Sequence, residues 1–124
     1  MFQEVKAMLP VSGDDYDAEI ILQIKAAALD LTRTAEIVLP GTVDITRTWT
    51  QTGTDPDEGY WTVTDNSSVT DELAVTAIAT WCNMRIGNPP NYDNLLKAYE
   101  SMKGSMRLSR MYTRAEGADD GCGW

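Results

Sequence analysis

Apolar residues recur at helical spacing at the start of the chain. One face of this stretch carries four of them: Phe2, Val5, Met8 and Leu9. The spacing predicts a short helix over residues 2–9. Pro10 ends it, because proline lacks a backbone N–H and disfavours helix in the residue before it.

A longer apolar stripe follows and predicts a second helix over residues 15–35. Its members lie at i, i+4, i+7 and i+11: Ile20, Ile24, Ala27 and Leu31. A second row of apolar residues widens the stripe: Ile21, Leu22, Ala28 and Leu29. We therefore expect this helix to be covered on two sides.

Four acidic residues lie just before this helix or in its first turn: Asp14, Asp15, Asp17 and Glu19. A calcium loop of the EF-hand type needs glycine at its sixth position and glutamate at its twelfth. Neither the register that starts at Asp14 nor the one that starts at Asp15 supplies them. Residues 12–15 instead offer N-cap side chains, and acids in a first turn face the positive end of the helix dipole. We interpret the acids as helix-capping residues.

Between residues 40 and 68 the hydrophobic period changes from helical to alternating. Nine threonines lie between Thr42 and Thr70, and β-branched residues in alternation favour strands. The stretches "VDITRTWT" and "YWTVT" predict two strands, and "QTGTDPDEG" between them is typical of a turn. The acids in that turn, Asp55, Asp57 and Glu58, are interpreted as a solvated tip, with a cation site as the less favoured alternative.

The predicted structure is thus a β-hairpin inserted between helices. Two strands alone are marginally stable in water, so we expect this hairpin to lie on the helices or on a neighbouring chain. Trp49 and Trp61, one on each strand, are its candidate partner-binding residues.

Two further helices follow. The third opens at "SSVTDELAV", where Ser68 and Asp71 approximate a capping box, and "NPP" at residues 88–90 prevents its continuation. The fourth is predicted from about residue 91 to residue 111. Its apolar stripe consists of Leu95, Tyr99, Met102 and Met106. Another face is basic, and four of its residues are candidates for contact with an acidic partner: Lys103, Arg107, Arg110 and Arg114.

The last ten residues, "AEGADDGCGW", cannot form a core by composition. We expect residues 115–124 to form an extended arm that another subunit holds. Trp124 would be its aromatic docking anchor, with Asp119 and Asp120 as acidic contacts.

These patterns predict a mainly α fold. It is a small four-helix bundle-like domain over residues 1–114, with the β-hairpin of residues 40–68 inserted and the C-terminal arm extended. A chain of 124 residues is long enough for one modest core but not for two independent ones.

Residue usage argues against catalysis. Histidine is absent, which removes the Ser-His-Asp triad, the Cys-His pair and most catalytic zinc sites. The two cysteines, Cys82 and Cys122, give neither a disulfide framework nor zinc-ligand spacing. We predict a protein that is not an enzyme and uses no cofactor or metal. No stretch approaches the roughly 18 apolar residues of a membrane span, and the first residues lack a secretory pattern.

The net charge of −9 is unevenly distributed. Residues 1–72 hold 14 acids and 4 bases, whereas residues 73–114 hold 2 acids and 6 bases. The acidic half argues against general nucleic-acid affinity, because phosphate neutralisation is its main source. Separated charges suit head-to-tail contact between copies of the chain. The alternative is an ordinary solvated surface with one basic helix.

The order of these elements and three short motifs resemble the head-tail connector family of long-tailed bacteriophages, also called adaptor or head-completion proteins. The matching residues are Glu4, Val5, Lys6 and Leu9; Asp14, Asp15, Asp17 and Ala18; and Ala77, Ile78, Trp81, Asn83 and Arg85. The likeness covers roughly residues 2–35 and 71–111. The threonine-rich hairpin departs from the shortest members, which join those helices by a plain loop.

The resemblance implies a structural role in the neck of a virion assembled in the bacterial host cytoplasm. Such proteins form a homo-oligomeric ring, usually of twelve copies. The ring binds the portal protein on one side and a tail-proximal neck or tail terminator protein on the other. It extends the channel through which DNA passes without specific binding, and no membrane is involved. The family brings no catalytic residues.

The alternative is a small DNA-binding helical protein involved in genome packaging. The basic residues of the fourth helix would then contact phosphates. The acidity of the first half of the chain counts against this function.

Overall fold

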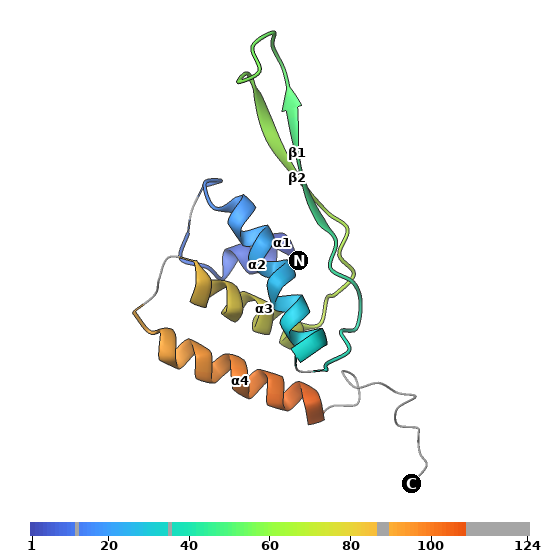
Figure 1. Cartoon of the computed structure of the whole chain (residues 1–124), viewed down its shortest axis with the longest axis vertical. Coiled ribbons are helices and arrows are strands. Elements are labelled where there is room, and N and C mark those ends of the chain that lie inside the picture. Colours follow the sequence, from blue (N-terminus) through green and yellow to red (C-terminus); the bar gives the residue numbers. More distant parts are fainter. Residues whose placement is uncertain (12, 35, 87–89, 109–124) are drawn as a thin grey trace.

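The computed structural model describes residues 1–108 except 12, 35 and 87–89. Figure 1 shows a helical body from which a β-hairpin rises as a separate ribbon. The elements in chain order are α1 (Phe2–Ala7), α2 (Asp17–Leu29), the π-helical turn η1 (Asp30–Thr34), β1 (Ile45–Gln51), β2 (Gly59–Asp65), α3 (Glu72–Arg85) and α4 (Tyr92–Leu108).

The fold is a mixed α/β arrangement, so the prediction of a mainly α, four-helix bundle-like domain is wrong. Helix α3 packs against α1, α2 and α4, and the two strands form an antiparallel sheet of their own. In Figure 1 α2 descends steeply, while α3 and α4 run across the body. Helix α1 has only six residues. These helices therefore do not make the four long walls of a bundle.

The core lies between the helices and the base of the hairpin. The predicted stripe of the second helix is confirmed, since Ile20, Ile24, Ala27 and Leu31 are all fully buried. The expected cover on a second side is wrong for two residues of the wider row. Leu22 remains 58% exposed and Leu29 50% exposed. Helix α2 therefore has an apolar outer face that this chain leaves in solvent.

The acids before α2 do not cap it. The helix begins at Asp17, and its N-cap residue Tyr16 makes no side-chain capping bond. Asp14 and Asp15 lie ahead of it and are exposed. The Asp17 carboxylate instead accepts a hydrogen bond of 2.7 Å from Lys6 Nζ on α1. This bond raises the pKa of the Lys6 ammonium, and it holds the two helices together across the break at Pro10.

At the third helix the capping residue is Asp71 alone. Its carboxylate accepts a hydrogen bond of 3.1 Å from the N–H of Ala74, which is the usual way to satisfy a free donor in a first turn. The other member of the predicted box, Ser68, lies outside the helix. Its Oγ accepts the N–H of Thr42 at 2.8 Å and closes the base of the hairpin.

The hairpin follows the predicted alternation. Ile45 pairs with Asp65, Arg47 with Val63, and Trp49 with Trp61, so these six residues share one face. Ile45 at the base is buried in the core, whereas the threonines of the opposite face are mostly exposed. The prediction that the hairpin lies on the helices is thus correct for its base only. Its outer half extends beyond the body (Figure 1).

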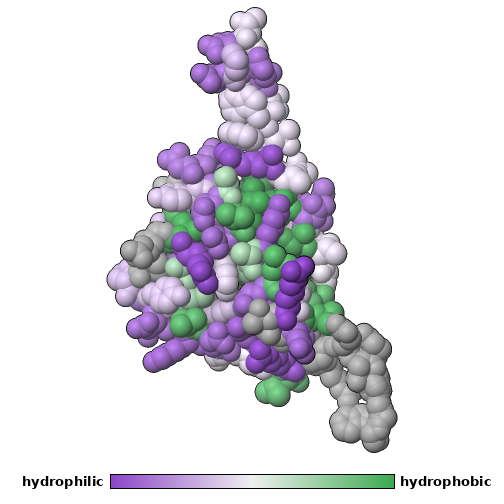
Figure 2. Space-filling model, viewed as in Figure 1, coloured by the Kyte–Doolittle hydropathy of each residue, from purple (hydrophilic) through white to green (hydrophobic). Residues whose placement is uncertain are grey.

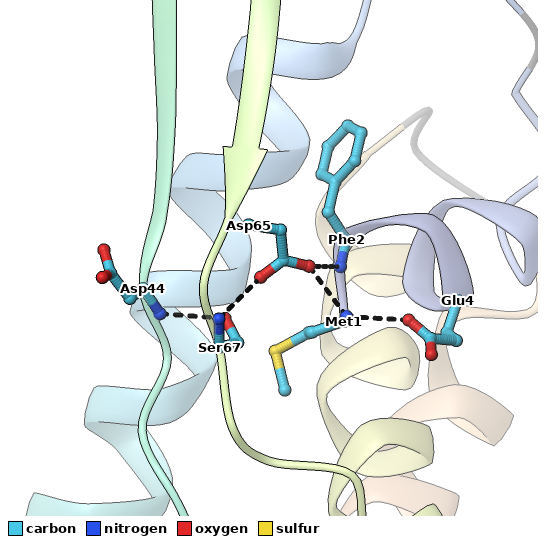
Figure 3. Close-up of polar contacts among 6 residues, drawn as sticks. All are labelled: Met1, Phe2, Glu4, Asp44, Asp65 and Ser67. Atoms are coloured by element: carbon cyan, nitrogen blue, oxygen red, sulfur yellow. Dashed lines mark hydrogen bonds and ion pairs between the residues drawn. The ribbon is translucent and has the colours of Figure 1, made fainter.

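Asp65 joins the end of β2 to α1, as Figure 3 shows. Its Oδ2 accepts hydrogen bonds from the Met1 ammonium at 2.8 Å and from the Phe2 N–H at 2.7 Å. Its Oδ1 accepts the N–H of Ser67 at 3.0 Å. Burial by itself would raise the pKa of this carboxyl. The donors outweigh burial and hold the pKa well below its usual range.

The predicted arm over 115–124, and with it the domain boundary at residue 114, lies outside the described residues. Among the described helices, none combines the length and apolar character needed to cross a bilayer.

Candidate interaction surface

Three side chains stack along the inner face of the hairpin. The rings of Trp49 and Trp61 meet edge to face, with centroids 5.3 Å apart and planes at 61°. The Arg47 guanidinium lies over the Trp61 ring, 4.1 Å from its centroid. We call these three residues the aromatic ladder. Such contacts are favourable beyond the area they bury, so the ladder stiffens a ribbon that has little core of its own.

The strand register and one glycine place the ladder. Trp49 and Trp61 are direct partners across the strands, which brings their side chains together on one face. Gly59 leaves room for the indole of Trp49. A Cβ at Gly59 would collide with the carbonyl oxygen of Thr50 and lie 2.7 Å from Trp49 Cζ2.

A groove of about 530 Å³ separates the ladder from α1 and the start of α2. Phe2, Lys6 and Asp17 line its helical side, and Arg47 and Trp61 line its hairpin side. The Nε of Arg47 is buried and has no hydrogen-bond partner among the described residues. Its lining holds two bases, Lys6 and Arg47, and two acids, Asp14 and Asp17, so this groove has no strong preference for either sign.

A second groove, of about 670 Å³, runs between the outer face of α2 and the chain that leads into β1. We call it the outer groove. Leu29, Val38 and Leu39 give it apolar walls, and Lys25 and Glu36 stand among its lining residues. In Figure 2 apolar residues gather on the body near the base of the hairpin, while the tip is polar. The groove belongs to the apolar face that α2 leaves uncovered.

One sequence-predicted contact residue lies inside the protein. Lys103 is 7% exposed, and its Nζ lies 3.3 Å from Asp30 Oδ2 in η1. The hydroxyl of Tyr99 donates to the same oxygen at 2.6 Å. Burial, and then this bond, raise the pKa of Tyr99 well above its usual range. The predicted exposed basic row is therefore corrected at Lys103, which serves to attach α4 to η1.

The other predicted contact residues are distributed as follows. Trp49 and Trp61 come together in the ladder, where Trp61 is 50% exposed. Arg107 is exposed near the end of α4. Five predicted residues lie outside the described residues, and their role in partner binding stays a prediction: Arg110, Arg114, Asp119, Asp120 and Trp124.

Sequence reasoning missed Arg47, Asp65 and the outer groove. Arg47 and Asp65 had a usable signal, because alternation places both on the inner face of the hairpin with the tryptophans. A charged residue on an inner face needs a partner. The groove had no such signal. Leu29 and Val38 read as core residues, and only the tertiary arrangement leaves them exposed.

The tip of the hairpin is an ordered acidic turn. The N–H of Asp57 donates to Asp55 Oδ1 at 3.2 Å, and the N–H of Asp55 donates to Glu58 Oε1 at 3.2 Å. Within residues 1–108, apart from the gaps named above, no group of three or more acidic or cysteine side chains is placed to hold a metal ion.

Comparison of the chain with protein-family models, with curated proteins and with solved structures finds no match. The molecular surface gives the functional evidence. It offers exposed aromatic and apolar side chains on a projecting ribbon and beside α2, which suits binding to protein rather than chemistry on a small molecule.

Proposed function

We propose that the protein is a structural component of a bacteriophage neck. In this proposal it forms an oligomeric ring that joins the portal protein to the tail or to downstream neck proteins. The motifs of the opening helix, of the acidic stretch and of the third helix motivate the family assignment. Twelve copies per ring is the number that the resemblance implies.

One observation carries the proposal: the chain leaves large apolar side chains exposed on a single face beside a projecting hairpin. Leu29 and Val38, which line the outer groove, are 50% and 40% exposed. Isolated exposed apolar residues are ordinary, but exposed apolar residues that line one groove are typical of a surface that another protein covers. A subunit that is completed by sister copies has this requirement, whereas a solitary monomer does not.

The charge distribution supports the channel role. Residues 1–72 carry ten more acids than bases. A channel wall of this sign repels phosphates, which lets DNA slide without adhering. The burial of Lys103 against Asp30 removes one cation from the row that a DNA-binding protein would use. We therefore do not favour the DNA-binding alternative.

The test is assembly of the full chain, alone and with the portal protein encoded in the same genome. Mass photometry over a range of concentrations should detect an oligomer of about twelve copies, or its formation on portal rings. Negative-stain images should then show a ring coaxial with the portal. A chain that stays monomeric at high concentration and does not bind portal rings would refute the proposal. An unrelated acidic protein of similar size serves as the control for non-specific adsorption to the portal rings.

A further inference from the structure

The hairpin tip and the outer groove lie at opposite ends of the ribbon. The groove includes residues 37–43, which lead directly into β1, whereas the tip is the turn over residues 52–58. Each strand has seven residues, and at about 3.3 Å per residue the ribbon is roughly 23 Å long. Paired strands of that length hold the tip away from the groove of its own chain (Figure 1). Any contact between the two must join different copies.

The outer part of the hairpin carries exposed aromatic side chains, and the outer groove has room for one of them. The outer part of the hairpin presents Tyr60 and Trp61, which are 54% and 50% exposed, and Pro56 closes a small hollow beside the tryptophans. The outer groove, at about 670 Å³, has room for an aromatic side chain and has apolar walls at Leu29 and Val38. An aromatic anchor in an apolar pocket is the usual centre of a protein interface.

Charge adds direction to this match. The tip carries Asp55, Asp57 and Glu58 and no base. On the groove side Lys25 is an exposed lining residue. Glu36 is the opposing acid among the groove residues. Lys25 and Glu36 balance each other among the lining residues, and acids alone occupy the tip, so docking is favoured in the orientation that places the tip acids toward Lys25.

The tip is also ordered before it binds. The N–H of Thr52 donates to the carbonyl oxygen of Glu58 at 2.9 Å, and the N–H of Glu58 donates to the carbonyl oxygen of Asp55 at 3.0 Å. The aromatic ladder fixes the strands below it. A preformed element loses little conformational entropy on docking, so less of the contact energy is consumed in ordering it.

We propose that the hairpin tip of one copy docks in the outer groove of the next copy. This inference rests on the proposed oligomeric function and specifies its contact. Tip and groove are different surfaces of one chain, so the contact is heterologous. Repetition of a heterologous contact closes a ring when the rotation between copies allows it. Each copy would then supply one tip and accept one tip.

The test uses three single variants of the full chain. Leu29→Glu places a carboxylate in the groove, where it meets the acidic tip. Trp61→Ala removes the anchor. Leu22→Glu is the matched control, because Leu22 lies on the same helix, is at least as exposed, and does not line the groove. Circular dichroism and thermal unfolding verify that each variant is folded, a check that matters most for Trp61→Ala because Trp61 also belongs to the aromatic ladder.

We expect Leu29→Glu and Trp61→Ala each to weaken assembly by about thirtyfold or more, the effect of losing an interface anchor. Leu22→Glu should assemble within about threefold of the natural chain. A mixture of the two defective variants is the decisive sample. The intact tip of Leu29→Glu can enter the intact groove of Trp61→Ala, but the reverse contact is lost. The mixture should therefore form one-to-one dimers that grow no further.

Other outcomes overturn the inference. If the natural chain forms rings and both defective variants also form them, the tip and groove are not the contact. If the mixture stays monomeric while each variant is folded, the two surfaces do not meet. If Leu22→Glu alone abolishes assembly, the copies meet on another part of α2. Each of these results leaves the oligomeric neck function standing. A natural chain that never assembles refutes that function instead.

Discussion

The carboxylate of Asp65 accepts the backbone N–H of Phe2 at 2.7 Å, so the end of the hairpin is bound directly to the first turn of α1. This bond links positions that are 63 residues apart. Between Asp65 and the body, backbone hydrogen bonds continue the pairing of the two chain segments as far as Thr42 and Ser68. The bond from Asp65 to Phe2 therefore anchors the hairpin at the point where it leaves the body. The direction of the hairpin, and hence the place of its tip, depends on this contact.

Replacement of Asp65 by asparagine should destabilise the protein at pH 7. The carboxylate accepts three hydrogen bonds, one of them from an ammonium, and the amide would keep the shape but lose the charge. Bonds to charged groups contribute about 1.5 to 3 kcal/mol each, and relaxation recovers part of that. We expect a loss of about 1 to 3 kcal/mol in the free energy of unfolding. Urea denaturation followed by circular dichroism measures it.

The pH dependence of that difference follows from the lowered pKa of Asp65. The Asp65 carboxyl holds its proton less tightly in the folded state than in the unfolded chain, where an aspartate has a pKa of about 3.9. The stability from Asp65 is therefore complete above that pH and falls as the pH drops below it. The difference in the free energy of unfolding between the natural chain and Asp65→Asn should decrease as the pH falls from about 4 to about 2. A gap that stays constant over this range would show that the carboxylate charge is unimportant.

Lys103 should behave as a stabilising residue, not as a surface contact. Lys103→Met removes the cation that faces Asp30 but keeps most of the side-chain volume. It leaves a partly buried carboxylate with Tyr99 as its remaining side-chain donor. We expect a loss of about 1 to 3 kcal/mol. The matched control is Lys97→Met, at an exposed position of the same helix, which should change stability by less than about 0.5 kcal/mol. Equal effects at both sites would contradict the buried pair.

The sequence predicted the main buried stripe of α2 and of α4, because helical periodicity is a local property of the sequence. Tyr99 and Met106 are buried as their spacing requires. The same spacing also explains why Lys103 is buried and not exposed as predicted. Lys103 follows Tyr99 by four residues, so the two side chains are neighbours on the same face of the helix. The angles between helices have no such local signature. A short α1 and a crossing α2 therefore replace the bundle that periodicity alone suggested, and the two paired strands make the fold mixed α/β.

The candidate site was predictable only in part. Alternation identified Trp49 and Trp61 as neighbours on one face, and their register confirms it. The outer groove arises because the chain after η1 folds back along α2, with the N–H of Ile37 donating to the Leu31 carbonyl oxygen at 2.8 Å. Glu36, at a φ of 56°, makes that reversal. The apolar pattern around Leu29 and Val38 does not predict a reversal of this kind.

The two glycines at positions 41 and 104 should respond to alanine in opposite ways. Gly41 has a φ of +141°, and a Cβ there would lie 2.8 Å from the backbone of Ser68. Gly41→Ala should therefore cost about 1 to 3 kcal/mol and loosen the base of the hairpin. Gly104 lies inside α4, where a Cβ meets nothing within 4 Å. Gly104→Ala should stabilise by about 0.5 to 1 kcal/mol. Thermal unfolding of both variants tests the pair, and a stable Gly41→Ala protein would contradict the close approach.

Cys82 offers a chemical probe of α3, the helix against which α1, α2 and α4 pack. Its thiol is buried, and burial raises its pKa to about 12. Since the thiolate is the reactive form, native protein at pH 8 should react with an aromatic disulfide reagent at least about a hundredfold more slowly than protein in urea. Cys122→Ser leaves Cys82 as the single thiol and makes the measurement clean.

The residual native rate then reports how often α3 opens, because reagent reaches the sulfur only through local or global unfolding. Assembly adds a further expectation. If sister copies occupy the outer groove, binding stabilises the folded chain, and the reaction should slow further as the protein concentration rises. The Leu29→Glu variant should lose this concentration dependence while keeping its slow monomer rate. Fast labelling of the native monomer would mean that the helices around Cys82 do not pack as described.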